Sequence, residues 1–411
     1  LILCTAFCST MWAQSLQEKI KNRQQLTNLA TVYFDVPDAV GKDINSVLFK
    51  DRVNNIAPYH QTTIQVVENG CQDGTGRPLG NFTESGLEIK VRGNSTADYD
   101  KKPYRLRFYK DEKDAAGNVI AKHKHDMLGY GYSKRNWTIL NNMRDGSLMQ
   151  NAITYYIGKA VGMPFCPGYK FVDLVINGEY RGNYMLSDHV EVGKNRININ
   201  EDTGWFVEST RNDMVEEPYF NDASLYVLIK SPESKDEAVT AKIKQMIRKY
   251  FVNNNNSLFG INTAGCDDKT FCDPFIGWRS VFDEESLVNF YVGLQLTGDS
   301  DGMMQVKMYR EENGKMHFGP LWDNEKAFGN TGEAPAISMT DLNTAGSYDG
   351  LMTNYAAYDV MKNIFTQLWQ ERWFANGVNN LWKEKHEAML AAMTSKATAL
   401  KTELEGSWAQ N

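Results

Sequence analysis

Residues 170–190 read KFVDLVINGEYRGNYMLSDHV, two largely apolar runs that meet at Asn177-Gly178. An Asn-Gly pair readily adopts the positive φ angles of a two-residue turn, so this stretch predicts an antiparallel β-hairpin. Alternating or β-branched runs also precede it, and they predict strands at residues 31–36, 62–67, 87–92, 104–109 and 136–142. The first half of the chain is therefore predicted to be rich in β-strands.

The second half is predicted to be mainly helical. Apolar residues at helical spacing predict helices at residues 143–162, 237–251, 283–296 and 358–407, and a further hairpin at residues 305–322. Asp145 or Ser147 is expected to cap the first of these helices, and Gly162 to end it. The sequence thus predicts an α+β fold. Its element order is also that of a two-lobed kinase, although many α+β proteins share that order.

The start of the chain suggests export. Residues 1–11 are apolar, and we expect residues 1–13 to be the remnant of a secretory signal with cleavage near Ala13 or Gln14. Residues 14–28 form a polar lead-in before the first predicted strand. The mature protein is accordingly expected in the periplasm, at the cell surface or outside the cell.

The net charge disfavours nucleic-acid binding, and the cysteine content leaves open whether a disulfide forms. The chain has 44 basic and 51 acidic residues, a net charge of −7, which argues against a general nucleic-acid binder. No stretch is long enough for a transmembrane helix. Cys266 and Cys272 bracket a polar loop and could form a disulfide in an exported protein, or remain two thiols; both readings stay open.

Residues 319–330, GPLWDNEKAFGN, place two carboxylates, Asp323 and Glu325, directly after a predicted buried strand. Charges at the edge of a core are costly unless something binds them. The pair therefore predicts a cation site. The alternative is that Asp323 caps a turn and Glu325 is a solvated charge.

Five blocks of the chain, taken together, resemble the spore-coat protein H (CotH) kinase family. They lie at residues 91–108, 136–162, 171–191, 204–210 and 318–330. The resemblance implies a two-lobed, atypical protein-kinase-like fold, with a β-rich N-lobe at about 29–200 and a helical C-lobe carrying a catalytic hairpin at about 201–408. It also implies an ATP-dependent kinase that acts on a protein substrate with Mg²⁺ or Mn²⁺.

The resemblance implies roles for the acidic residues. Asp323 stands where the family has its metal-binding Asp, and Glu325 replaces the second acid of the usual W-D-x-D. In the loop at residues 296–309, Asp301 is the predicted base or substrate-positioning acid and Asp299 is the alternative. Gln305 takes a place where relatives carry Asn or Ser, which weakens the case for a second metal position.

The phosphate-binding candidates lie around a Gly-Asn-Ser turn. Asn94 and Ser95 belong to this turn, and the cations Arg92, Lys101, Lys102 and Arg105 cluster around it. A flexible turn with nearby cations suits a triphosphate, so Arg92, Asn94, Ser95 and Lys102 are the predicted ligands. Lys101 and Lys102 should point to opposite faces of the strand, and Lys102 matches the family's Lys-Pro. A charged edge that prevents aggregation is the alternative reading.

Further polar residues are candidates for the site. Arg144 and Asp145 begin the predicted helix where relatives carry an R-D or D-K-S block. Glu208 could lie at the lobe hinge near the adenine, with Lys230 nearby. Asp145 could serve catalysis or only cap the helix that follows it.

Two other functions remain open beside the kinase. A pseudokinase acting as a binding or structural module would account for Gln305 and Glu325, and for the scarcity of ATP outside the cytoplasm. A hydrolase that acts on polysaccharide through paired carboxylates would leave the ordered basic blocks unexplained. Convergence of Lys102, Asp301 and Asp323 on one site would favour the kinase-derived readings.

Overall fold

The computed structural model describes residues 15–70, 77–121, 123–210, 219–222, 225–232, 237–251, 278–299, 302, 305–328, 365, 368–369 and 371–408. Strands and helices are mixed, so the predicted α+β class is confirmed. The chain forms two compact units. Unit 1 comprises residues 1–143, 168–189 and 397–411, and unit 2 comprises residues 144–167 and 190–396. Among the described residues, none of the helices is sufficiently long and apolar to span a bilayer.

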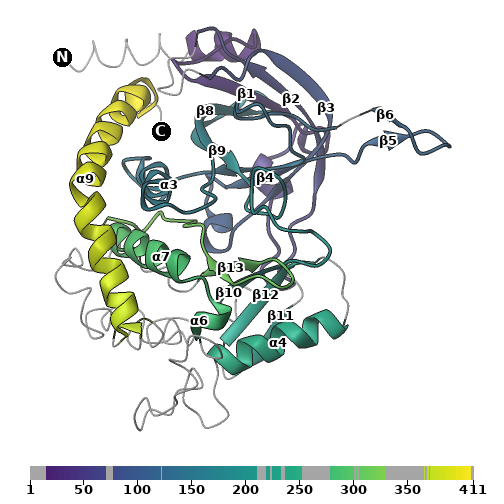
Figure 1. Ribbon diagram of the computed structural model, residues 1–411. Coiled ribbons are helices and arrows are strands. Elements are labelled where there is room, and N and C mark those ends of the chain that lie inside the picture. Colours follow the sequence, from purple (N-terminus) through teal and green to yellow (C-terminus); the bar gives the residue numbers. More distant parts are fainter. Residues whose placement is uncertain are drawn as a thin grey trace. The chain divides into compact units, whose positions relative to one another are not determined.

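In unit 1, seven strands close into a barrel (Figure 1). Their order around the barrel is β1 (Ala30–Asp35), β2 (His60–Val67), β3 (Phe82–Val91), β4 (Tyr104–Phe108), β7 (Asn136–Leu140), β9 (Glu179–Asp188) and β8 (Tyr169–Ile176). Neighbouring strands are antiparallel except β1 and β8, whose parallel pairing closes the barrel. The predicted hairpin is β8–β9, and each strand predicted before it is present.

Short elements link the barrel strands. They are η1 (Pro37–Ala39), α2 (Ile44–Val47), η2 (Ser95–Asp98), β5 (Glu112–Lys113) and β6 (Val119–Ala121). β5 and β6 form a separate two-stranded ribbon that extends away from the barrel in Figure 1.

Apolar side chains on β1 and β8 hold the closing pair together. Val32 and Phe34 lie opposite Leu174 and Ile176, and all four are at most 1% exposed. Full burial of a side chain of this size contributes roughly 1.5–3 kcal/mol. Closure of the barrel is therefore stabilised largely by the core.

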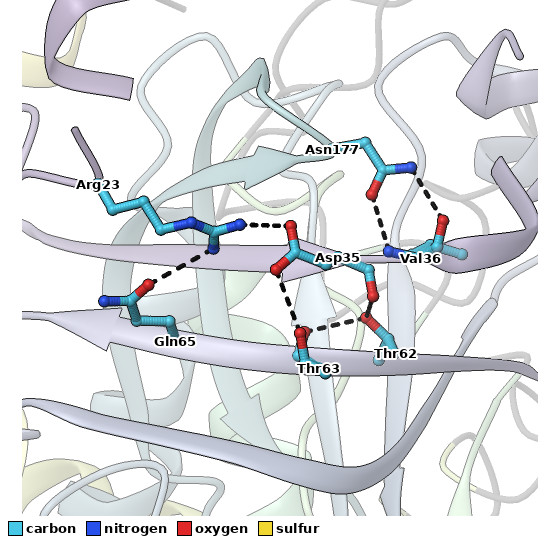
Figure 2. A network of polar contacts seen from close by, with 7 residues as sticks. All are labelled: Arg23, Asp35, Val36, Thr62, Thr63, Gln65 and Asn177. Atoms are coloured by element: carbon cyan, nitrogen blue, oxygen red, sulfur yellow. Dashed lines mark hydrogen bonds and ion pairs between the residues drawn. The ribbon is translucent and has the colours of Figure 1, made fainter. Parts of the chain in front are cut away.

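The turn residue Asn177 extends this ladder with its side chain (Figure 2). Asn177 has a φ of 49°, and its amide both accepts from the backbone N–H of Val36 (2.7 Å) and donates to the Val36 carbonyl (3.0 Å). The side chain thus pairs with β1 as a neighbouring strand would. Arg23, which precedes β1, bonds to Asp35 at 2.5 Å in the same view and ties the lead-in to the barrel.

A buried carboxylate, Asp173 on β8, joins both ends of the described chain to the barrel. It is 0% exposed and accepts hydrogen bonds from Thr27 (2.6 Å), Tyr180 (2.9 Å) and Ser407 (3.4 Å). Burial raises the pKa of Asp173 from an ordinary 3.8 to about 6, although the three hydroxyl donors lower it. Ionised Asp173 is thus disfavoured in the folded state.

We expect the free energy of unfolding to carry an Asp173-dependent fall as the pH rises from about 4 to about 6. In this window the folded state binds more protons than the unfolded state, so each unit of pKa shift removes about 1.4 kcal/mol, roughly 3 kcal/mol in all. Asp173→Asn should abolish this part of the pH dependence in urea unfolding at pH 4 and pH 7. The exposed Glu384→Gln is the control. If the free energy of unfolding of Asp173→Asn depended on pH as strongly as that of the wild type, the raised pKa could not belong to Asp173.

Unit 2 is built on a five-stranded antiparallel sheet. Its order is β11 (Tyr219–Asp222), β12 (Leu225–Ser231), β10 (Trp205–Thr210), β13 (Lys307–Arg310) and β14 (His317–Phe318). The helices are α3 (Gln150–Val161), α4 (Glu237–Phe251), α6 (Trp278–Val281), α7 (Glu284–Thr297) and α9 (Arg372–Trp408). Residues of α9 from Ala397 onward group with unit 1.

The two faces of this sheet carry different clusters. Trp205, Val207 and Met308 pack in one apolar cluster with Ile243 of α4 and its neighbours. Because side chains alternate along a strand, the residues between them face the other way. Phe206 and Tyr309 accordingly belong to a second cluster, with Phe165 and Ile197.

The helix predicted at residues 143–162 begins later than expected, at Gln150. Leu148 has a φ of 62°, which no right-handed helix accommodates, so the preceding residues form a turn. Asp145 closes that turn, accepting from the backbone N–H groups of Ser147 and Gln150, both at 2.8 Å. The N-cap position of α3 is Met149, with no capping bond from its side chain, so the predicted cap at Asp145 or Ser147 is wrong. Gly162, with a φ of 101°, ends the helix as predicted.

Candidate functional site

An ion pair between a buried lysine and a half-buried glutamate lies across strands β10 and β13 of unit 2. Glu208 pairs with Lys307 in the ladder, and Lys307 Nζ is 3.4 Å from Glu208 Oε1. Lys230 Nζ is 3.9 Å from the other carboxylate oxygen. Burial lowers the pKa of Lys307, whose side chain is 4% exposed, while the negative charges of Glu208 and Asp323 raise it. Two cations and two carboxylates therefore form one charge cluster.

Asp323 reaches this cluster from the loop that follows β14. The preceding residues anchor the loop: Trp322 stacks on Tyr155 of α3 with 6.0 Å between ring centroids. Leu321 packs where α3 and α7 present glycines, and a Cβ on Gly293 would lie 3.1 Å from its Cδ1. Asp323 itself has a φ of 62°, a left-handed conformation that Asp tolerates better than most residues.

Asn324 ties the loop to two helices. It is 0% exposed, and its backbone N–H donates to Asn151 Oδ1 of α3 at 2.8 Å. Its Nδ2 donates to Asp299 Oδ2 at 2.5 Å. Asp299 is also 0% exposed and follows Gly298, whose φ of 58° ends α7. The segment after α7 and the loop after β14 thus meet at a single buried amide.

Gly302 allows the chain to pass close beside Asp299. A Cβ at this position would lie 2.6 Å from Leu294 Cδ1 and 3.6 Å from Asp299 Oδ2. Leu294 is fully buried, so it has little room to move. A side chain at position 302 would therefore have to displace Leu294 of α7.

The oxygen donors of this loop fit a magnesium–phosphate complex. Asn324 Oδ1 is buried and accepts no hydrogen bond from the described residues, which is costly for an amide oxygen. In the sequence Asn324 stands between Asp323 and Glu325, and Glu325 is 6% exposed. No group of three His, Cys, Asp or Glu among the described residues could hold a metal ion. Mg²⁺ commonly takes only one or two carboxylates and completes its shell with phosphate and water.

The predicted phosphate-binding residues all lie in unit 1, at the β3–β4 connection. Lys102 is buried, its Nζ donates to the Ala97 carbonyl at 2.8 Å, and burial lowers its pKa while Asp98 and Asp100 raise it. Asn94 Oδ1 accepts from Lys50 and Arg52, both at 3.1 Å. Several cations thus surround this turn.

The other predicted residues of the turn lie at its edges. The Arg92 backbone N–H donates to the Pro103 carbonyl at 3.0 Å and closes the connection between the antiparallel strands β3 and β4. Ser95 is exposed at the start of η2.

The remaining predicted residues lie outside the described part of the chain or do not belong to the charge cluster. Asp301 lies outside the described residues, as do the signal segment and Cys266 and Cys272. Gln305 accepts a hydrogen bond from Lys307 Nζ (3.4 Å) through its backbone carbonyl. Arg144 is exposed in the turn before α3.

Sequence reasoning missed Lys307 and Asn324. Lys307 lies beside Val306 and Met308 in a predicted strand. A single charged residue within an apolar strand could have indicated a polar site here. Its pairing with Glu208 depends on strand register and could not be read from the sequence. Asn324 separates Asp323 from Glu325, and the prediction named the two carboxylates but not the amide between them.

A comparison with protein-family models matches residues 89–411 to the model described as CotH kinase protein. The chain belongs to the CotH kinase family. The match covers most of the chain, including every described residue of the charge cluster, and confirms the resemblance predicted from the sequence. A search of curated proteins gave no match. Membership of the CotH kinase family indicates a kinase-like protein.

Proposed function

We propose that this protein is an exported, atypical protein kinase that transfers the γ-phosphate of ATP to protein hydroxyls with Mg²⁺ or Mn²⁺. We also propose that its fold is two-lobed and kinase-like. The observation that carries the proposal is the charge cluster of half-buried Glu208 and Asp323 around buried Lys307, beside the oxygen donors of the following loop. Phosphoryl transfer requires such carboxylates and cations for positioning and charge stabilisation.

In this proposal Asp323 and the Asn324 amide oxygen would hold the metal, with Glu325 and Gln305 as further oxygen donors. The metal–nucleotide complex supplies the activated phosphoryl group and neutralises part of its charge. The charges of Lys307 and Asp323 attract each other, and Glu208 pairs with Lys307. Lys102, Arg92, Asn94 and Ser95 retain their predicted role as nucleotide-phosphate ligands, with Arg144 as a further phosphate candidate.

Asp301 is proposed to accept the proton of the substrate hydroxyl. Asp299 acts one step away, because its carboxylate fixes the Asn324 side chain. A positioning role therefore suits Asp299 better than direct proton transfer.

The test is incubation of the full chain with γ-labelled ATP and either Mg²⁺ or Mn²⁺. We expect label to appear on the protein itself or on an added protein acceptor, and to disappear when EDTA removes the metal. Nucleotide binding without any transfer would instead support the second candidate, a pseudokinase that serves as a binding or structural module. This alternative is favoured by Gln305 and Glu325, which differ from the residues that the family usually carries at these positions.

A further inference from the structure

A cavity of about 480 Å³ lies in unit 2, away from the charge cluster. The loop before β10, helix α4 and the turn after β13 line it, with Asp202, Trp205, Lys242, Gln245, Arg310 and Glu312 among the lining residues. Its size is within the range of small-ligand sites, which commonly combine an apolar wall with a few polar groups.

The cavity and the charge cluster lie on opposite faces of one sheet. In the β10–β13 ladder, Trp205 pairs with Arg310, and Glu208 pairs with Lys307 three residues further along. Three residues span about 10 Å of strand, and an odd spacing reverses the direction of the side chain. Trp205 belongs to the cluster that includes α4, so the cavity lies on the α4 face. A ligand here would not occupy the proposed nucleotide site.

Arg310 is the fixed cation of this cavity. Its guanidinium lies 4.9 Å from the centre of the Trp205 ring, and it donates to the carbonyls of Glu311 (3.1 Å) and Glu312 (2.7 Å). No described carboxylate forms an ion pair with it, and burial lowers its pKa. Guanidinium has five N–H donors, so donors remain for a ligand, in a group whose orientation is already set.

The other lining charges restrict the charge of the ligand. Lys242 adds a second cation at the exposed surface of α4, whereas Asp202 and Glu312 add two carboxylates. The lining therefore carries no net charge, and its two carboxylates repel a phosphate ester, with two or more negative charges, more strongly than a ligand with a single carboxylate on Arg310. A planar carboxylate matches the guanidinium fork, and Gln245 can bond to an adjacent amide.

We propose that this cavity binds the glutamate or aspartate side chain of a peptide, with Arg310 as the principal carboxylate ligand. Lys242 assists from the rim and Gln245 contacts the peptide backbone. The site is independent of phosphoryl transfer, since it uses none of the residues proposed for that reaction.

The test measures binding of the capped peptide Gly-Gly-Glu-Gly-Gly to the full chain by ligand-observed NMR. We expect the matched glutamine peptide to bind about tenfold more weakly, as the loss of a charge-assisted hydrogen bond implies. Arg310→Gln should weaken binding of the glutamate peptide by about the same factor. Glu312→Gln should strengthen binding, an effect that a purely structural role would not produce.

Further arms separate this site from its alternatives. Lys242→Gln, at an exposed position, should weaken binding even if Arg310→Gln fails to fold. Asp323→Ala, on the other face of the sheet, should leave peptide binding unchanged. Equal binding of the glutamate and glutamine peptides, absence of binding, or tighter binding of a phosphoserine peptide would each overturn the proposal.

Discussion

Replacing Asp323 by alanine is expected to abolish metal-dependent nucleotide binding and to lower phosphoryl transfer by roughly a hundredfold or more. The metal would lose its best-placed anionic ligand, and Lys307 would lose one of the two carboxylates that offset its burial. Asp323→Asn should be nearly as damaging, because it keeps the shape and removes the charge. Calorimetric titration with ATP, with and without Mg²⁺, measures the binding loss directly.

The matched control for this experiment is Glu384→Ala, which removes a carboxylate from an exposed position on α9. It should bind nucleotide and transfer phosphate as the wild type does. Both Asp323 variants should also unfold cooperatively, which would separate loss of the site from loss of the fold. Wild-type ATP affinity with Mg²⁺ in Asp323→Ala and Asp323→Asn would show that the metal role belongs elsewhere.

The second large effect distinguishes Asp301 from Asp299. A base that receives the substrate proton acts on the transfer step, so Asp301→Ala should lower transfer by roughly a hundredfold or more. Its ATP affinity should stay within a few-fold of the wild type, because the nucleotide site keeps all its proposed ligands. Single-turnover transfer and equilibrium ATP binding, measured on the same preparation, separate the two quantities.

Asp299→Ala should give a different pattern. Its removal leaves the buried Asn324 amide without its partner, which costs about 1–3 kcal/mol of stability. ATP affinity should therefore fall along with stability, and the loss of transfer should be smaller than for Asp301→Ala. If instead Asp299→Ala binds ATP normally and transfers nothing, the proposed register of this loop is wrong by two residues.

Local signals in the sequence were sufficient for most of the secondary structure. The Asn177-Gly178 pair set the β8–β9 turn, and the predicted helix at residues 237–251 has the observed bounds of α4. The helix ending at Gly162 was also predicted, although its start was not, because the left-handed Leu148 has no sequence signal. Asp323 was singled out for the same kind of reason, a charge at the edge of an apolar run.

Only the tertiary structure decided what those residues meet. The parallel pairing of β1 with β8 closes the barrel, and the register of β10 on β13 sets Glu208 against Lys307. Asn324 contacts Asn151, which lies 173 residues away in the chain. Periodicity and turn residues report the conformation of a few neighbouring residues, because backbone sterics act locally. Pairings between distant strands depend on how the whole core packs, and no short stretch of this sequence contains that information.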